Sequence, residues 1–581
     1  MSNLLPPKAV GVRHLAYAQS HRFIRDDSGM ITIFATFMLL LFLMVCGIAV
    51  DLMRNEIERT RLQNTLDRAI VAAADLDSEL DAEAVVRDYF AKSGVGQYLD
   101  SVTVTPGTLL PSSHFRSVSA TARARTPSPY MRMTGQNTLP VYTSGKAEEK
   151  MTNVEISLIL DVSGSMNSNS RLTNLKIAAK DFVDQVLDNS QKDRLHITII
   201  PYATQVSLPQ HLVDQLRLTN EHNYSRCVNF SASDFASAGI DPAGVLERTM
   251  HFDPWSTSDG RDDDPAMNLV PRPVCEDNAA REMILFQNDA TILKTYIENL
   301  SARGNTSIDI GMKWGAAMLD PKMRPTINAL AAAKWVPAPF SDRPKAYSDP
   351  DTLKVIVLMT DGQNTSQYYI EDDHRRNDSQ VYWNPLDEVY SMYDSNGTAD
   401  PDDDTFYLRD ANGNLKKPDG TDVGGKTAWS QDAGWNNLPY GCSAPGPAKN
   451  GNWDCGPTSP GKGTFRLSYA DLWAYTSIKG NVENNYYPFK ARSTANSLWR
   501  EGVYDSVSGS RKDDRTKDIC GATKKENVIV YTIGFEAPAG GKTVLQNCAS
   551  SPAHFFDVNG LQIADAFTSI ANEITQLRLT Q

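Results

Sequence analysis

An apolar run that ends in alternating oxygen-bearing side chains is the tightest constraint on how this chain can fold. In residues 154–160, five of seven are apolar, as expected for a strand buried on both faces of a sheet. The run leads into Asp161, Ser163 and Ser165, and Gly164 between the serines permits a tight turn. In open α/β sheets, ligands bind at the carboxyl ends of strands. A carboxylate and two hydroxyls are therefore predicted to converge there, and such hard oxygen donors suit Mg²⁺ better than zinc or copper.

From residue 153 onwards, apolar strand patterns alternate with helical patterns, which predicts an α/β fold with a doubly wound, mostly parallel sheet. The expected strands are 154–160, 195–201, 354–359, 527–533 and 553–557. The expected helices are 172–187, 289–300, 308–319, 543–548 and 560–577.

Two long insertions, at about 203–288 and 364–525, interrupt this domain of residues 151–581. Loops of such length inside a compact domain are usually functional or carry structure of their own. The second insertion starts shortly after Asp361, at the end of an expected strand, so we expect it to emerge near the metal-binding edge and to contribute to recognition.

Two further loops complete a recognisable pattern. Thr306 precedes the helical pattern 308–319, and Asp361 ends an apolar run as part of Thr360-Asp361-Gly362. With the D-x-S-x-S sequence that begins at Asp161, this resembles the metal-ion-dependent adhesion site of von Willebrand factor A domains, which takes a Thr from a second loop and an Asp from a third. The resemblance covers all the expected positions, in the family's chain order.

The resemblance implies a function in binding rather than catalysis. Mg²⁺ or Mn²⁺ would be held by the serines directly and by the other ligands directly or through water, and one position would accept a carboxylate from a protein partner. The implied ligands are Asp161, Ser163, Ser165, Thr306 and Asp361. The alternative is that these are turn and cap residues that hold no metal.

An uncharged segment of 21 residues, 30–50, is long enough to span a bilayer as a helix. It is longer than a usual signal-peptide core and lacks a clear cleavage site, so we expect an uncleaved anchor, with removal as the alternative. Residues 51–92 continue with helical spacing, and 102–105, 118–125 and 140–145 are expected to be short strands. We therefore expect a small α+β spacer over 51–150, with an irregular linker as the alternative.

The cysteines indicate on which side of the membrane the chain lies. Lys and Arg residues flank the apolar segment in equal numbers, so the positive-inside rule does not decide. Six cysteines follow Cys46 of that segment, which is compatible with three disulfides in an oxidising compartment. Pairing of sequence neighbours is one of fifteen connectivities. It gives Cys227–Cys275, Cys442–Cys455 and Cys520–Cys548. Residues 1–29 would then be cytoplasmic; six free thiols in a cytosolic protein is the alternative.

Both ends of the chain resemble TadG-like proteins of the Flp, or tight-adherence, pilus-assembly system. The resemblance rests on residues 27–30, 47–51, 62–63, 67, 69 and 72–74, and on 548–550, 555–556 and 577–580. It implies a single-pass protein of the bacterial inner membrane, with its bulk in the periplasm, that assembles or anchors a pilus with pilus-assembly partners. Prepilin processing after Gly29 would require Glu where Phe34 stands, so we expect no such processing.

The remaining composition excludes some classes and leaves two alternatives. A net charge of −13 argues against a nucleic-acid surface. No H-E-x-x-H, G-x-S-x-G or phosphate-loop motif occurs, so we expect no enzyme. The alternatives are an anchored adhesin that binds an extracellular surface independently of a pilus, and an envelope enzyme that uses the domain to recruit substrate.

Overall fold

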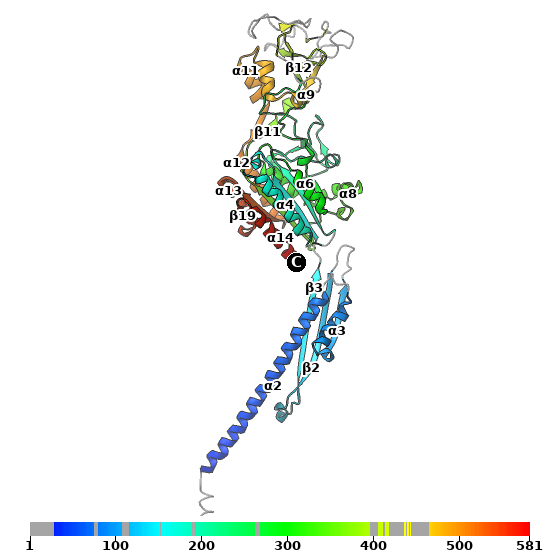
Figure 1. Ribbon diagram of the computed structural model, residues 1–581, viewed down its shortest axis with the longest axis vertical. Helices are drawn as coiled ribbons and strands as arrows, with labels where there is room; N and C mark the ends of the chain where they lie inside the picture. The colour runs from blue at the N-terminus through cyan, green and yellow to red at the C-terminus, as the bar shows by residue number, and fades with distance from the viewer. Residues whose placement is uncertain are drawn as a thin grey trace, which may run out of the picture. The chain divides into compact units, whose positions relative to one another are not determined.

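The computed structural model divides the chain into two compact units, one ending at Met151 and one beginning at Thr152 (Figure 1). It describes residues 28–74, 80–106, 115–150, 153–188, 190, 193–261, 268–394, 405–410, 413–416, 435–436, 439–440, 442 and 464–580.

The N-terminal unit is built on one long helix, α2 (Ser28–Ala74). Its first part is apolar and exposed; Leu39 and Phe42 are each 58% exposed. By length and composition this part could cross a membrane, and a signal sequence would share these properties. Further along the same helix, Leu62 and Leu66 are fully buried. The expected helical continuation beyond residue 50 is therefore confirmed as far as the end of α2, where one face of the helix is buried and the other exposed.

The rest of this unit is a second helix and a small sheet. Helix α3 (Ala82–Lys92) is capped by Asp81, whose carboxylate accepts a hydrogen bond from Ala84 N–H. The antiparallel sheet has the order β1-β2-β3. The predicted strands are confirmed, with longer bounds: β1 Leu99–Pro106, β2 Phe115–Pro127 and β3 Thr138–Lys150. Val118 and Ala120 of β2 belong to the same hydrophobic core as the buried face of α2.

The unit that begins at Thr152 contains a six-stranded sheet with the order β19-β18-β10-β4-β5-β9. All neighbouring strands are parallel except β5 and β9, which are antiparallel. The strands are β4 Asn153–Asp161, β5 Leu195–Tyr202, β9 Ile284–Gln287, β10 Thr352–Thr360, β18 Ile529–Phe535 and β19 Phe555–Val558. The predicted α/β class and five predicted strands are confirmed, whereas β9 was not predicted.

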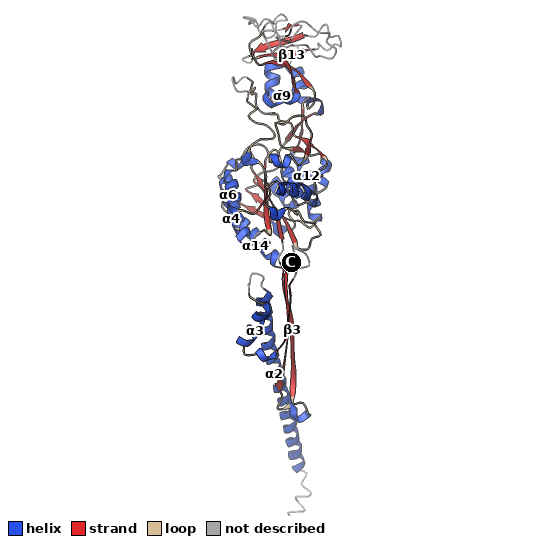
Figure 2. Cartoon of the chain, turned by 90° about the vertical axis from the view of Figure 1, so that its right-hand side faces the viewer, coloured by secondary structure: helices blue, strands red, loops and turns tan. Residues whose placement is uncertain are grey.

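Helices cover both faces of this sheet (Figure 2). Every residue of β4 is buried; Leu158 and Leu160 pack into the core on one face, and Ile159 into the core on the other. The first face carries α4 Arg171–Asp188, α6 Ala290–Asn299 and α14 Gln562–Thr580. The second carries α7 Ile308–Ala317, α8 Arg324–Ala332, α12 Gly509–Lys525 and α13 Ala539–Cys548.

Both insertions carry structure of their own. The first contains α5 Gln210–Val213 and a short sheet of β6 Arg217–Leu218, β8 Val245–Arg248 and β7 Val228–Asn229. The second begins and ends with the paired strands β11 Gln367–Ile370 and β17 Tyr504–Val507. Between them lie β12 Asp378–Asn384, β13 Val389–Asp394, β14 Thr405–Asp410, β15 Trp435–Asn436, β16 Phe465–Ser468, α9 Tyr469–Tyr475, α10 Ile478–Gly480 and α11 Arg492–Asn496.

The two insertions share one hydrophobic core. Trp383 and Trp473 of the second insertion are buried in the same cluster as Phe252 of the first. Tyr224 of the first insertion also donates a hydrogen bond from its hydroxyl to Asp471 Oδ1, at 2.7 Å. The insertions therefore support each other as one lobe.

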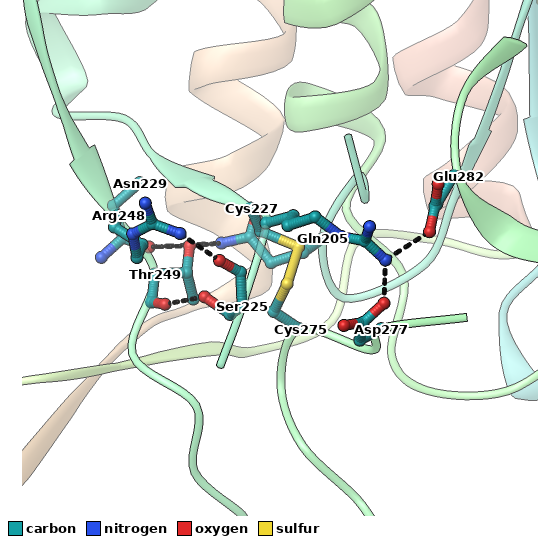
Figure 3. The surroundings of a disulfide bond; sticks show 10 residues. Gln205, Ser225, Cys227, Asn229, Arg248, Thr249, Cys275, Asp277 and Glu282 are labelled. Atoms are coloured by element: carbon teal, nitrogen blue, oxygen red, sulfur yellow. Dashed lines mark hydrogen bonds and ion pairs between the residues drawn. A yellow bond between two sulfur atoms is a disulfide. The ribbon is translucent and has the colours of Figure 1, made fainter. Parts of the chain in front are cut away.

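Two predicted disulfides are present. Cys227–Cys275 lies within the first insertion (Figure 3). On one side of the disulfide Arg226 pairs with Asp277 and Glu282, and on the other Gln205 donates to Thr249. Cys520–Cys548 joins α12 to α13. Cys442 is also disulfide-bonded, but its predicted partner, Cys455, lies outside the described residues.

Close packing of α7 on the sheet gives a test of this fold. A Cβ at Gly311 would lie 2.8 Å from Cγ of Tyr202, a buried ring whose hydroxyl bonds to the Met359 carbonyl. Gly311→Ala should therefore destabilise the chain by about 1–3 kcal/mol because the ring cannot move aside. Gly521→Ala in α12 is the control: its Cβ would meet nothing within 4 Å, so a gain of up to about 1 kcal/mol is expected from helix propensity. Thermal unfolding followed by circular dichroism measures both, and equal effects would contradict this packing.

Candidate metal centre

The candidate centre lies where two neighbouring parallel strands end. Strands β4 and β10 pair in register up to Leu160 and Met359, so the loops that follow them begin side by side. The first loop carries the two serines, and the second begins with Asp361. A connection from β5 runs beside them, since Asp161 pairs with Tyr202. The loops of Asp161 and Asp361 therefore meet at the carboxyl edge of the sheet, as predicted, and the connection from β5 lies beside them.

Four of the five predicted residues form one connected hydrogen-bond network. Asp161 Oδ1 accepts from the Ser163 N–H at 2.7 Å, and its Oδ2 accepts from the Thr360 hydroxyl at 2.6 Å. The hydroxyls of Ser163 and Ser165 lie 3.0 Å apart. Ser165 donates its hydroxyl to Asp361 Oδ1 at 2.7 Å. The first and third loops are thus in direct contact.

Thr306 lies beside this network. A Cβ placed at Gly362 would be 3.6 Å from Thr306 Oγ1 and 3.9 Å from Ser165 Oγ, so both hydroxyl oxygens lie within 4 Å of one point. Among the described residues, the Thr306 hydroxyl has no hydrogen-bond partner. The loop approaches closely because Gly304, at φ +88°, accepts a bond at its carbonyl from Gly164 N–H at 2.9 Å. The structure therefore brings all five predicted residues together.

The two carboxylates at the centre, those of Asp161 and Asp361, are both buried but have different neighbours. Asp161 is fully buried, and this burial, with the nearby charge of Asp361, raises the pKa of Asp161 to about 6. Asp361 Oδ2 instead pairs with the Arg171 guanidinium at 2.9 Å. Arg171 also contacts Glu536, which follows β18, at 2.9 Å. Sequence reasoning missed Arg171; its position at the start of the helix after the serine loop was the available signal.

A second unpredicted residue, Lys512 of α12, holds two of the loops together. Its buried ammonium group donates to the Thr306 carbonyl at 2.7 Å, the Ser307 hydroxyl at 2.5 Å and the Thr365 carbonyl at 2.8 Å. Burial lowers the pKa of Lys512 to about 8, while buried Asp309, 4.0 Å away, acts in the opposite direction. No local pattern pointed to this residue. The predicted second insertion, 364–525, included α12, but the insertion closes at β17 and α12 packs against the six-stranded sheet.

The donor set is chemically suited to a hard divalent cation. It offers two carboxylates and three hydroxyls, all oxygen donors of the kind that Mg²⁺ and Mn²⁺ accept. Within the described ranges, no three His, Cys, Asp or Glu side chains come together as a metal-binding group. A zinc or copper site built from nitrogen and sulfur ligands is therefore not what these residues offer.

Comparison with protein families supports the N-terminal resemblance. Residues 29–76 match the family model described as "Putative Flp pilus-assembly TadE/G-like". This confirms the TadG-like resemblance over α2. No curated protein matches the chain.

Solved structures with a detectable similarity include pilus and adhesion proteins. The vWF domain of the type V pili tip protein Mfa5 from Porphyromonas gingivalis is 12% identical, with a TM-score of 0.29, over 74% of this chain and 97% of that one. The adhesive tip pilin GBS104 from Group B Streptococcus agalactiae is 12% identical, with a TM-score of 0.27, over 73% and 100%. The pilus adhesin RrgA from Streptococcus pneumoniae is 12% identical, with a TM-score of 0.26, over 82% and 48%. Similarity at this level does not by itself define the fold.

The contacts of Lys512 lead to a prediction. Lys512→Met removes a buried ammonium group that donates to three acceptors on two loops and that lies 4.0 Å from buried Asp309, so we expect a loss of about 3 kcal/mol in the free energy of unfolding. Lys517→Met on the exposed face of the same helix is the control and should change stability by less than about 0.5 kcal/mol. Denaturant titration of the detergent-solubilised chain measures both. Equal stability of the two variants would show that Lys512 does not hold the loops.

Proposed function

We propose that the unit beginning at Thr152 is a doubly wound von Willebrand factor A domain that binds a partner protein through a divalent cation. The proposed cation ligands are Asp161, Ser163, Ser165, Thr306 and Asp361. The observation that carries the proposal is the direct bond from Ser165 to Asp361, at 2.7 Å across 196 positions of sequence. The Thr306 and Ser165 hydroxyl oxygens both lie within 4 Å of a Cβ placed at Gly362.

The surroundings of Asp161 support a cation at this place. A buried carboxylate without a compensating charge is costly, and here both oxygens receive only neutral donors, from Ser163 and Thr360. A nearby divalent cation would favour the ionised form. Bound there, Mg²⁺ or Mn²⁺ would supply a Lewis-acidic position for a carboxylate oxygen of the partner. The serine loop would orient the cation, and the buried edge of the sheet would limit access of water.

We further propose that α2 anchors the protein in the bacterial inner membrane and that the unit from Thr152 lies in the periplasm. The exposed apolar part of α2 and its match to the TadE/G-like family support the anchor. The disulfides Cys227–Cys275 and Cys520–Cys548 support an oxidising compartment. The protein would bind other pilus-assembly components and take part in assembling or anchoring a Flp-type pilus, and so in adherence, without enzymatic activity.

Metal titration tests the ligand set. Isothermal calorimetry of the detergent-solubilised chain should detect Mg²⁺ binding, and Asp161→Ala or Asp361→Ala should abolish it, because each removes a carboxylate from the site. Asp214→Ala, at an exposed position of the first insertion, should leave binding unchanged. Circular dichroism establishes that each variant folds. No heat of binding from the unmutated chain would overturn the proposal.

The orientation of the anchor has its own test. Alkaline phosphatase is active only after export, so a fusion to Gln581 should be active and a fusion before residue 28 inactive. A cytoplasmic reporter such as green fluorescent protein should give the reverse pattern. Phosphatase activity confined to the N-terminal fusion would place the folded unit in the cytoplasm and contradict the proposal.

A further inference from the structure

A cavity of about 480 Å³ opens directly beside the candidate metal centre. Its lining includes Gly304 and Asn305, the two residues that precede Thr306. Asn305 is held by a hydrogen bond from its side-chain amide to the Ser366 carbonyl at 2.8 Å. One wall of the cavity is therefore the loop that carries a proposed cation ligand.

The charged residues of the lining are two arginines and one glutamate. Arg272 and Glu276 belong to the first insertion, and Arg303 directly precedes Gly304. Glu276 is already engaged, since it lies 2.7 Å from Arg281 and 3.4 Å from Arg303. Arg272 is exposed, and it has no hydrogen-bond or ion-pair partner in the part of the chain that the structure describes. Arg272 thus lines the cavity with a cationic side chain that no described residue engages, in a chain whose net charge is −13.

The segment that carries Arg272 is fixed in place. Cys275 ties it to Cys227, and the Val274 N–H donates to the Phe252 carbonyl at 3.0 Å. Arg281 connects it to the metal loops, because its guanidinium donates to the carbonyls of Arg303, at 2.7 Å, and Val162, at 3.3 Å. The disulfide of Figure 3 therefore holds a cationic wall against the loop that follows Asp161.

The remaining wall is aromatic. Trp255 is half-buried and lines the cavity. Its ring packs edge-on against Tyr368 of β11, with centroids 5.8 Å apart, and Tyr368 packs in turn against Tyr504 of β17, at 5.5 Å. Trp and Arg are the residue types most enriched among those that dominate binding energy at protein interfaces. A guanidinium also recognises carboxylates through paired hydrogen bonds.

We propose that this cavity is a second recognition site for the same partner: it takes a second acidic side chain of the segment whose first carboxylate reaches the cation. Arg272 pairs with the second carboxylate, and Trp255 packs against the side-chain stem. This inference rests on the proposed function, which places the first carboxylate at the metal centre. The ligand class is therefore an acidic peptide segment with two acidic residues a few positions apart.

Fluorescence anisotropy with synthetic peptides tests the inference on the detergent-solubilised chain. The probes are labelled Gly/Ser peptides that carry one Glu, or two Glu separated by one to four residues, with Mg²⁺ or with EDTA. At the best spacing, the second Glu should tighten binding about fivefold. Arg272→Ala should remove that gain and leave binding of the one-Glu peptide unchanged. Arg217→Ala, an exposed arginine of the first insertion outside the cavity, should retain the gain.

Reversing the charge of Arg272 should change which peptide the protein prefers. Arg272→Glu should prefer a peptide in which Lys replaces the second Glu. A gain from the second Glu that is absent at every spacing, or that persists in Arg272→Ala, would overturn the inference while Mg²⁺-dependent binding of the one-Glu peptide upholds the proposed function. Conversely, if the gain depends on Arg272 and is equally large in EDTA, the cavity still binds an acidic side chain but the metal centre is rejected. If the unmutated chain binds none of the peptides, both the inference about the cavity and the proposed function are overturned.

Discussion

The buried carboxylate of Asp161 is the constraint on which the arrangement at the sheet edge depends. It ends a strand that is buried along its whole length, so both of its oxygens must find donors inside the protein. One donor, the Ser163 N–H, comes from its own loop and bends that loop back over the strand end. The other, the Thr360 hydroxyl, comes from the neighbouring strand. Satisfying one carboxylate therefore fixes the path of two loops at once.

Segments far apart in sequence then hold the remaining loop in place. The α7 N-terminus is capped from another loop, because the Ile308 N–H donates to Asn364 Oδ1 at 2.8 Å. Asn364 in turn donates its amide to Asp513 of α12 at 2.9 Å. Since α12 follows the second insertion, this last bond joins residues 149 positions apart in sequence. The candidate centre is thus a product of the whole unit rather than of one motif.

The elements that could be predicted are those whose burial shows in their own apolar sequence pattern. Strands such as β4 and β10 are nearly continuous apolar runs, and the donors at their ends follow in the same local pattern. Helix α12 escaped prediction because its buried face includes Lys512, Thr516 and Thr523, so hydrophobic periodicity is weak there. Lys512 could not be assigned to the centre because its partners belong to other loops, whereas Arg171 was missed although it begins the helix that follows the serine loop. The cavity lined by Trp255 and Arg272 likewise depends on how the first insertion folds back.

The pairing of β11 with β17 has a consequence for how such a protein can diversify. Gln367 lies opposite Val507, so the second insertion leaves and re-enters the domain at neighbouring points. The intervening lobe has its own hydrophobic core, shared with the first insertion rather than with the six-stranded sheet. A different second insertion could therefore be attached to the same two-stranded stem without changing the core of the six-stranded sheet, as long as it still covered the first insertion's share of the common core, such as Phe252. The stem is thus a point at which evolution could replace one binding specificity with another.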